Sequence, residues 1–366
     1  MEKGTQVSID FGLERWQKVK EDYSRWWLGD LDRPLVQFLA TGRDPGRPEP
    51  RLPSHEFTAF YDLSVSAEAI VDRWDYDLSC VEFLGDAFPQ VWPNFGPGVI
   101  AAFMGCELEL GNGTVWFHPA HDLDIADIHF QYNPDSVWFK RIKDICQAAV
   151  DRWGGLVQIG MTDIGGNFDI LSAFRPGEKL LLDLYDYPVE VKRLLWEAHE
   201  AWWTYFGEID AILKPANPGY SSWAPLFSTE PYYMLQSDFS YMIGPDMFEK
   251  HALPELHASC KRLGNAFYHL DGPGQLPHLD LLLGLTELKG IQWVPGAGKS
   301  CDQWPEVYRK IRASGKLVHV FGTPEEMDAI VNQIGDCRGI LLTGIADTQA
   351  EAARCIANYS TVESRR

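Results

Sequence analysis

Basic residues are scarce in this chain of 366 residues. It has 32 Lys and Arg against 52 Asp and Glu, which gives a formal net charge of −20. Binding to nucleic acid requires clustered Lys and Arg to neutralise phosphates, and the sequence has no such cluster. An acidic balance is typical of a soluble protein that does not bind anionic lipid. We therefore expect neither a nucleic-acid partner nor a membrane partner.

Long apolar runs are also missing, and cysteines are few. No stretch approaches the ~18 apolar residues that a transmembrane helix needs, and Met1–Gln6 lacks the basic and apolar regions of a secretory signal. The seven cysteines are scattered and never spaced as CxxC. Thiols in a reducing compartment explain this pattern better than a disulfide framework or a cysteine-rich zinc knot. The sequence predicts a cytoplasmic location.

Three common catalytic motifs are absent or incomplete. No GxGxxG follows the first predicted strand, which argues against NAD. The segment 296–300, Gly-Ala-Gly-Lys-Ser, resembles the end of a phosphate loop, but Gln292 and Trp293 occupy the region where the first glycine belongs. No GxSxG is present, so a serine hydrolase is not supported. We expect no nucleotide cofactor.

What the sequence does contain is an alternation of short apolar runs with helical segments. The predicted strands are mostly continuous apolar runs, as in parallel strands covered on both faces. Helical stripes lie between them, and 215–242 forms an irregular, aromatic-rich region expected to lie over one end of the sheet. This rhythm predicts a single (β/α)₈ barrel domain spanning 1–366. The predicted strands are 34–40, 79–84, 156–161, 267–271, 291–295, 317–321 and 340–343.

Polar residues follow several of these strands, and in a barrel such positions face the active site. His269 and Asp271 lie two apart on one strand, so both side chains point the same way. Imidazole and carboxylate together suit acid–base catalysis or a metal site. The alternative is structural, with Asp271 capping a turn and His269 bonded within the core. The other candidates are Asp86, Asp163 and Gln292 near strand ends, and Asp238 in the irregular region.

At these residues the sequence resembles the uroporphyrinogen decarboxylase superfamily, which includes cobalamin-dependent (corrinoid) methyltransferases. The resemblance covers about 15–357 and implies a barrel with a deep cleft at its carboxyl-terminal end. In the decarboxylases an early aspartate holds the pyrrole nitrogens, and Asp86 stands at about that position. The arginine-rich signature of those enzymes is replaced by Asp32-Arg33-Pro34. The motifs that carry the resemblance are Asp30–Pro34, Gly85-Asp86, Thr162–Gly166, Leu182–Pro188, Ser237-Asp238 with Ile243–Phe248, and His269–Gly272.

The methyltransferase branch binds zinc through a His-x-Cys pair and a later Cys. Here His269 matches, Asp271 replaces the first cysteine, and no cysteine occurs near Thr343–Ile345. Zinc with oxygen ligands remains compatible with such a site. The resemblance thus implies His269 and Asp271 as catalytic residues or metal ligands, with Asp86, Asp163 and Asp238 orienting the substrate. The aromatic wall of the pocket would come from Trp92, Trp223, Tyr241 and Trp293, beside Gln292.

Three hypotheses follow. The first is a methyltransferase that moves a methyl group from a small substrate to a corrinoid protein, with zinc as a candidate cofactor. The second is decarboxylation of uroporphyrinogen or a related polycarboxylate. The third, from a different class, is a non-catalytic barrel that binds a ligand. Homodimers are common in the resembled family, and we expect a homodimer here by analogy alone.

Overall fold

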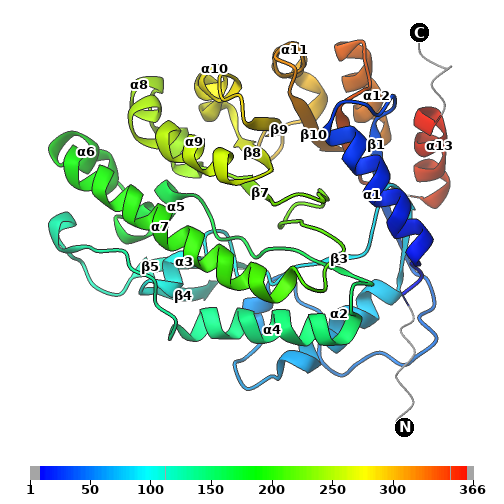
Figure 1. The fold of residues 1–366 in the computed structure, drawn as a ribbon, viewed down its shortest axis with the longest axis horizontal. Coiled ribbons are helices and arrows are strands. Elements are labelled where there is room, and N and C mark those ends of the chain that lie inside the picture. Colours follow the sequence, from blue (N-terminus) through cyan, green and yellow to red (C-terminus); the bar gives the residue numbers. More distant parts are fainter. Residues whose placement is uncertain (1–8, 112, 347, 361–366) are drawn as a thin grey trace.

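The computed structural model describes residues 9–111, 113–346 and 348–360 (Figure 1). Residues 1–8, on which the expectation of no secretory signal rests, lie outside this part of the chain. Within the described residues, no helix is both long enough and apolar enough to cross a membrane. One continuous cluster of buried apolar side chains joins elements from the first helix to the last.

The main sheet has seven strands in the order β2-β1-β11-β10-β9-β8-β7. Every neighbouring pair in it is parallel except β1 and β2, which are antiparallel. The predicted mixture of helices with a parallel sheet is therefore confirmed. The strands of this sheet are β1 (Leu35–Thr41), β2 (Val81–Gly85), β7 (Tyr232–Leu235), β8 (Asn265–Asp271), β9 (Leu288–Val294), β10 (Leu317–Gly322) and β11 (Ile340–Gly344).

Two smaller sheets are also present in the described part of the chain. Strands β3 (Gln90–Val91) and β6 (Gln158–Ile159) form a parallel pair, and β4 (Cys106–Gly111) and β5 (Thr114–Pro119) form an antiparallel hairpin. Among the described residues no ladder joins the β3–β6 pair to the main sheet, so a closed eight-stranded barrel is not shown. After β6, an isolated main-chain hydrogen bond joins this segment to the one that leads into β7. The N–H of Met161 donates to the carbonyl of Ser221 (2.9 Å).

Helices surround the strands. In Figure 1, α8 to α12 run outside β7–β10, and α2, α4 and α7 cover the opposite side of the molecule. The helices are α1 (Leu13–Trp27), α2 (Ala67–Ser79), α3 (Ile100–Phe103), α4 (Val137–Trp153), α5 (Asn167–Phe174), α6 (Lys179–Asp186), α7 (Pro188–Leu213), α8 (Pro245–Met247), α9 (Leu253–Arg262), α10 (Leu279–Leu283), α11 (Pro305–Ala313), α12 (Pro324–Ile334) and α13 (Gln349–Ser360). Short helical turns are η1 (Thr58–Phe60), η2 (Ile125–Asp127), η3 (Asp238–Met242), η4 (Phe248–Ala252), η5 (Pro273–His278) and η6 (Cys301–Gln303).

Local signals in the sequence explain where helix α12 begins and ends. The Thr323 hydroxyl accepts from the Glu326 N–H, and the Glu326 carboxylate accepts from the Thr323 N–H, which forms the expected capping box. Pro324 occupies the first turn, where its missing N–H costs nothing. Gly335 then ends the helix with φ +78°, a left-handed conformation that favours glycine.

The structure corrects the second predicted strand, 79–84. Helix α2 continues to Ser79, and β2 starts at Val81 and runs antiparallel to β1. Gly85 ends β2 with φ +65°, and a Cβ atom there would lie 2.3 Å from the Val36 carbonyl oxygen. Only glycine fits this close approach. The chain therefore turns beside the start of β1, not at the carboxyl ends of the parallel strands.

The irregular region 215–242 is more ordered than we expected. It contains strand β7, which pairs with β8, and the turn η3 that follows it. All four residues of β7 are buried. Because the strand has only four residues and its flanks are rich in Pro, Ser and aromatics, periodicity did not reveal it.

Candidate active site

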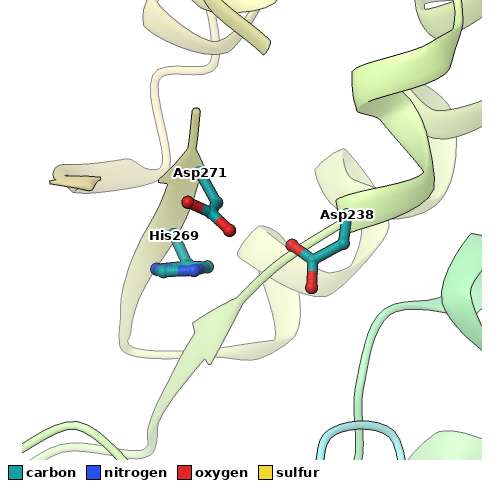
Figure 2. A group of neighbouring side chains, drawn as sticks. All are labelled: Asp238, His269 and Asp271. Atoms are coloured by element: carbon teal, nitrogen blue, oxygen red, sulfur yellow. The ribbon is translucent and has the colours of Figure 1, made fainter. Parts of the chain in front are cut away.

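Three potential ligand side chains meet at the carboxyl ends of β7 and β8, which we call the mouth. His269 and Asp271 are on β8, and Asp238 opens η3 directly after β7. One ligand atom from each residue lies within 4.8 Å of the other two. Figure 2 shows the carboxylates of Asp238 and Asp271 facing each other, with the His269 ring beside them. The structure thus brings together the predicted pair and Asp238.

The imidazole of His269 is held on two sides. Its Nδ1 forms a short hydrogen bond with Oε1 of Gln292, and Trp223 meets the ring edge-on with centroids 5.0 Å apart. Burial lowers the pKa of His269, against the hydrogen bond to Gln292 and the nearby Asp271. The ring is therefore neutral near pH 7. Because Nδ1 is engaged by Gln292, Nε2 is the nitrogen left for a ligand.

Carboxyl groups crowd this end of the molecule. Burial raises the pKa of Asp163, Asp169 and Asp238 to about 7 each, and repulsion from neighbouring aspartates adds to the effect. Asp238 is exposed, so water reaches its carboxylate although protein surrounds much of it. Within the described residues, no Lys or Arg forms an ion pair with these three groups or with Asp271. The mouth is therefore strongly acidic.

Asp163 is fixed by main-chain donors. Its Oδ1 accepts hydrogen bonds from the N–H groups of Gly165 (2.9 Å) and Gly98 (3.4 Å), and from the side-chain amide of Gln236 (3.4 Å). The Asp169 carboxylate accepts from the Phe239 N–H (2.8 Å), which ties helix α5 to the turn η3. These bonds favour the charged forms, but burial outweighs them.

Two of the predicted aromatic residues, Tyr241 and Trp223, lie at the mouth. Tyr241, on η3, is 53% exposed. A Cβ atom added to Gly272 or Gly274 would lie 2.9 or 2.7 Å from its ring, so the ring rests on the backbone just after Asp271. With Trp223 beside His269, Tyr241 gives the acidic mouth an aromatic side.

Two predicted residues, Asp86 and Trp293, are not brought to this cluster. Asp86 lies at the start of β1, where its carboxylate accepts from Arg33 (2.7 and 2.8 Å) and from the Val36 N–H (2.8 Å). Its expected place at the mouth was wrong because β2 runs antiparallel to β1. Trp293 points to the other face of β9 from Gln292 and contacts Trp304 (5.1 Å). Trp92 is half-buried after β3.

Sequence reasoning missed three polar residues, His319, Thr343 and Gln37, that connect to His269 through the predicted residue Gln292. Gln292 also bonds His319 on β10, and His319 bonds Thr343 on β11, which bonds Gln37 on β1. Gln37 and His319 each interrupt an apolar run, and that interruption was the available signal. Asp169 was missed because it is a helical residue, and nothing in the sequence marks its approach to η3.

Other hollows lie away from the mouth. One, of about 500 Å³, lies at the amino ends of β9 and β10, where Arg312 and Lys316 are among its lining residues. Lys316 already donates to the Leu285 and Leu288 carbonyls (2.6 and 2.7 Å). Because perturbed carboxyl groups and an imidazole gather at the mouth, the chemistry favours the mouth over this hollow.

Comparison with known proteins supports the fold. A solved structure described as a methyltransferase from Methanosarcina mazei matches with a TM-score of 0.58 and 15% sequence identity. The match covers 93% of this chain and 97% of that chain. No protein-family model matches, and no curated protein matches. At 15% identity the likeness establishes a shared fold, and the chemistry must be argued from the residues at the mouth.

Proposed function

We propose that this protein is a metal-dependent methyltransferase that moves a methyl group from a small substrate to a corrinoid carrier. The observation that carries the proposal is the group of Asp238, His269 and Asp271, with one ligand atom from each within 4.8 Å of the others. One nitrogen and two carboxylate oxygens suit zinc or a similar divalent cation. The methyltransferase structure that shares the fold adds support by analogy.

The protein residues have distinct parts in this proposal. His269 and the two carboxylates would hold the metal, which when bound supplies a Lewis acid that polarises the substrate or lowers the pKa of a bound thiol. Tyr241 and Trp223 form apolar surface for a small methylated molecule. Transfer of the methyl group leaves an electron pair on the substrate heteroatom. Asp163, whose pKa is raised to about 7, is suited to supply the proton that this heteroatom takes up.

The alternative hypothesis, decarboxylation of a polycarboxylate, has less support. Such a substrate needs cationic groups for its carboxylates. Arg33, the arginine of the Asp32-Arg33-Pro34 segment, is engaged by Asp86 and by Asp22 (2.8 Å), away from the mouth. An acidic mouth would repel a polyanion.

Metal content of protein purified without chelator tests the proposal. We expect near-stoichiometric zinc or another divalent metal in the wild type, and its loss in His269→Ala and Asp271→Asn. His257→Ala is the matched control, because His257 is 40% exposed and pairs only with Glu287 (3.3 Å) among the described residues. The metal-loaded protein should then transfer a methyl group from methylated thiols or amines to free cob(I)alamin, supplied already reduced, to give methylcobalamin. Visible absorption spectroscopy measures this change.

Equal metal content in the wild type and both site variants would overturn the metal site. Metal binding without methyl transfer to cobalamin, across thiol, amine and ether donors, would favour the third hypothesis, a barrel that binds a ligand without turnover.

A further inference from the structure

A row of buried polar side chains crosses the sheet next to His269. His269 on β8 is the register partner of Gln292 on β9, and Gln292 is the partner of His319 on β10. Farther along, Thr343 on β11 is the register partner of Gln37 on β1. On β11, Thr343 lies two residues after Leu341, the register partner of His319. Register partners, and residues two apart on one strand, point to the same face, so these side chains can form hydrogen bonds sideways across five strands. We call Gln37, Thr343, His319 and Gln292 the polar chain.

The polar chain is continuous. The Thr343 hydroxyl donates to Oε1 of Gln37 (2.9 Å), Nε2 of His319 lies 3.0 Å from that hydroxyl, and Nε2 of Gln292 lies 2.9 Å from Nδ1 of His319. Oε1 of Gln292 then meets Nδ1 of His269. Gln37 is 3% exposed and both Gln292 and His319 are 0% exposed. Water therefore cannot substitute for a wrongly placed donor at these positions.

Every bond in the polar chain has only one workable direction. Nε2 of Gln37 donates to the Pro225 carbonyl (2.9 Å), and a carbonyl can only accept. The amide orientation of Gln37 is thus anchored, and its Oε1 faces Thr343 as an acceptor. The Thr343 hydroxyl must give its single proton to that oxygen. It can then only accept from His319, so Nε2 of His319 carries a proton.

The remaining steps follow in the same way. A neutral His319 protonated at Nε2 presents a lone pair at Nδ1, which takes a proton from the Gln292 amide nitrogen. Burial lowers the pKa of His319 to about 3, so this ring stays neutral. The Gln292 oxygen then faces His269 and can only accept. Nδ1 of His269 must therefore carry the proton.

We propose that the polar chain is a positioning device that holds His269 in its Nδ1–H tautomer and leaves the Nε2 lone pair for a ligand at the mouth. Its four members are positioning residues, since they act on the mouth only through His269. Metal-binding histidines generally need their second nitrogen fixed in this way. The part of the inference that concerns metal affinity rests on the proposed function; the tautomer itself does not.

Histidine-selective ¹⁵N labelling and long-range ¹H–¹⁵N correlation spectra of the metal-free protein test the tautomer directly. His269 should carry its proton on Nδ1 and His319 on Nε2. Thr343→Val keeps the shape but removes the hydroxyl that links His319 to the anchored amide. We expect His319 and His269 to show mixed tautomers in that variant, and Thr343→Ser to restore the wild-type spectrum. If the wild-type spectrum alone shows His269 with its proton on Nε2, the inference is overturned.

Zinc affinity, measured by competition with a chromophoric chelator, gives the second readout. Loss of an outer partner of a metal-binding histidine typically costs about 10–100-fold in affinity. We expect a loss of that size for Thr343→Val and Gln292→Met, with Thr343→Ser close to wild type. Folded variants, judged by circular dichroism, that keep both affinity and tautomer would refute the positioning role. If the wild type binds no metal but shows the expected tautomers, the proposed function fails and the positioning inference stands.

Discussion

Asp86 provides a sharp test of how this chain is folded. Its carboxylate is almost buried (8% exposed) and is held by two bonds from Arg33 and one from the Val36 main chain. In Asp86→Asn the charge is lost, and one amide N–H must face the guanidinium. Removing one partner of a buried ion pair costs about 3–5 kcal/mol, and the remaining pair of Arg33 with Asp22 places the expected loss near the lower figure, about 3 kcal/mol.

That loss converts into a measurable shift. Unfolding entropies near 2.1 cal/mol/K per residue give about 0.8 kcal/mol/K for a chain of 366 residues, so the melting temperature should fall by about 4 °C. Differential scanning calorimetry measures this shift, and a zinc titration of the folded variant should match wild type. Asp280→Asn is the control, because its carboxylate is 76% exposed in a surface pair with Lys310 and should cost less than about 1 kcal/mol. An unchanged melting temperature with lost metal binding would refute this placement of Asp86.

Three further outcomes are expected. Burial raises the pKa of Asp163, Asp169 and Asp238 to about 7, so the native state holds protons that the unfolded chain releases, and the melting temperature should fall as pH rises from about 4 to 7. Asp163→Asn should remove one of these contributions and make the slope less steep, and a flat wild-type profile would contradict the assignment. Trp223→Phe should shift the imidazole resonances of His269, whereas Trp293→Phe, on the other face of β9, should leave them in place. Asp271→Cys should give a thiolate-to-cobalt absorption band when cobalt(II) is added. The control, Asp246→Cys at an exposed position of α8, should give no such band. If Asp271→Cys also gives no band, Asp271 is not a metal ligand.

The second half of the fold was predictable because its strands are strong apolar runs. Segments 317–321 and 340–343 were expected, and β10 and β11 exceed them by one residue each. The first half was harder. Strand β3 was not predicted, because its two residues are too few for any periodic signal, and strand β6 covers only two residues of the predicted strand 156–161. The antiparallel direction of β2 leaves no mark in the sequence, because apolar pattern reports burial and says nothing of strand direction.

The site residues were predicted correctly where the alternation of side chains along a strand was used, and the prediction failed where that alternation was ignored. His269 and Asp271 were found because residues two apart share a face. The same rule separates Gln292 from Trp293, so the expectation that both face one pocket was wrong for Trp293. His319 lies mid-strand between Val318 and Val320, and its polar character alone could have marked it. Its connection to Thr343 and Gln37 could not be predicted, because it depends on the order of strands in the sheet.

The acidic mouth also provides a test between the two catalytic hypotheses, because they predict opposite proton exchange with the buffer when a ligand binds. Burial and repulsion among aspartates keep Asp163 and Asp169 partly protonated near pH 7, with pKa values of about 7. A divalent cation at the mouth would offset that repulsion, lower both pKa values and release protons to the buffer. A polycarboxylate would add negative charge, raise both pKa values and take protons up. Calorimetric titrations at pH 7 in two buffers of different ionisation enthalpy show whether protons are released or taken up on binding. Proton release with zinc, and no proton uptake with polycarboxylates, would favour the methyltransferase.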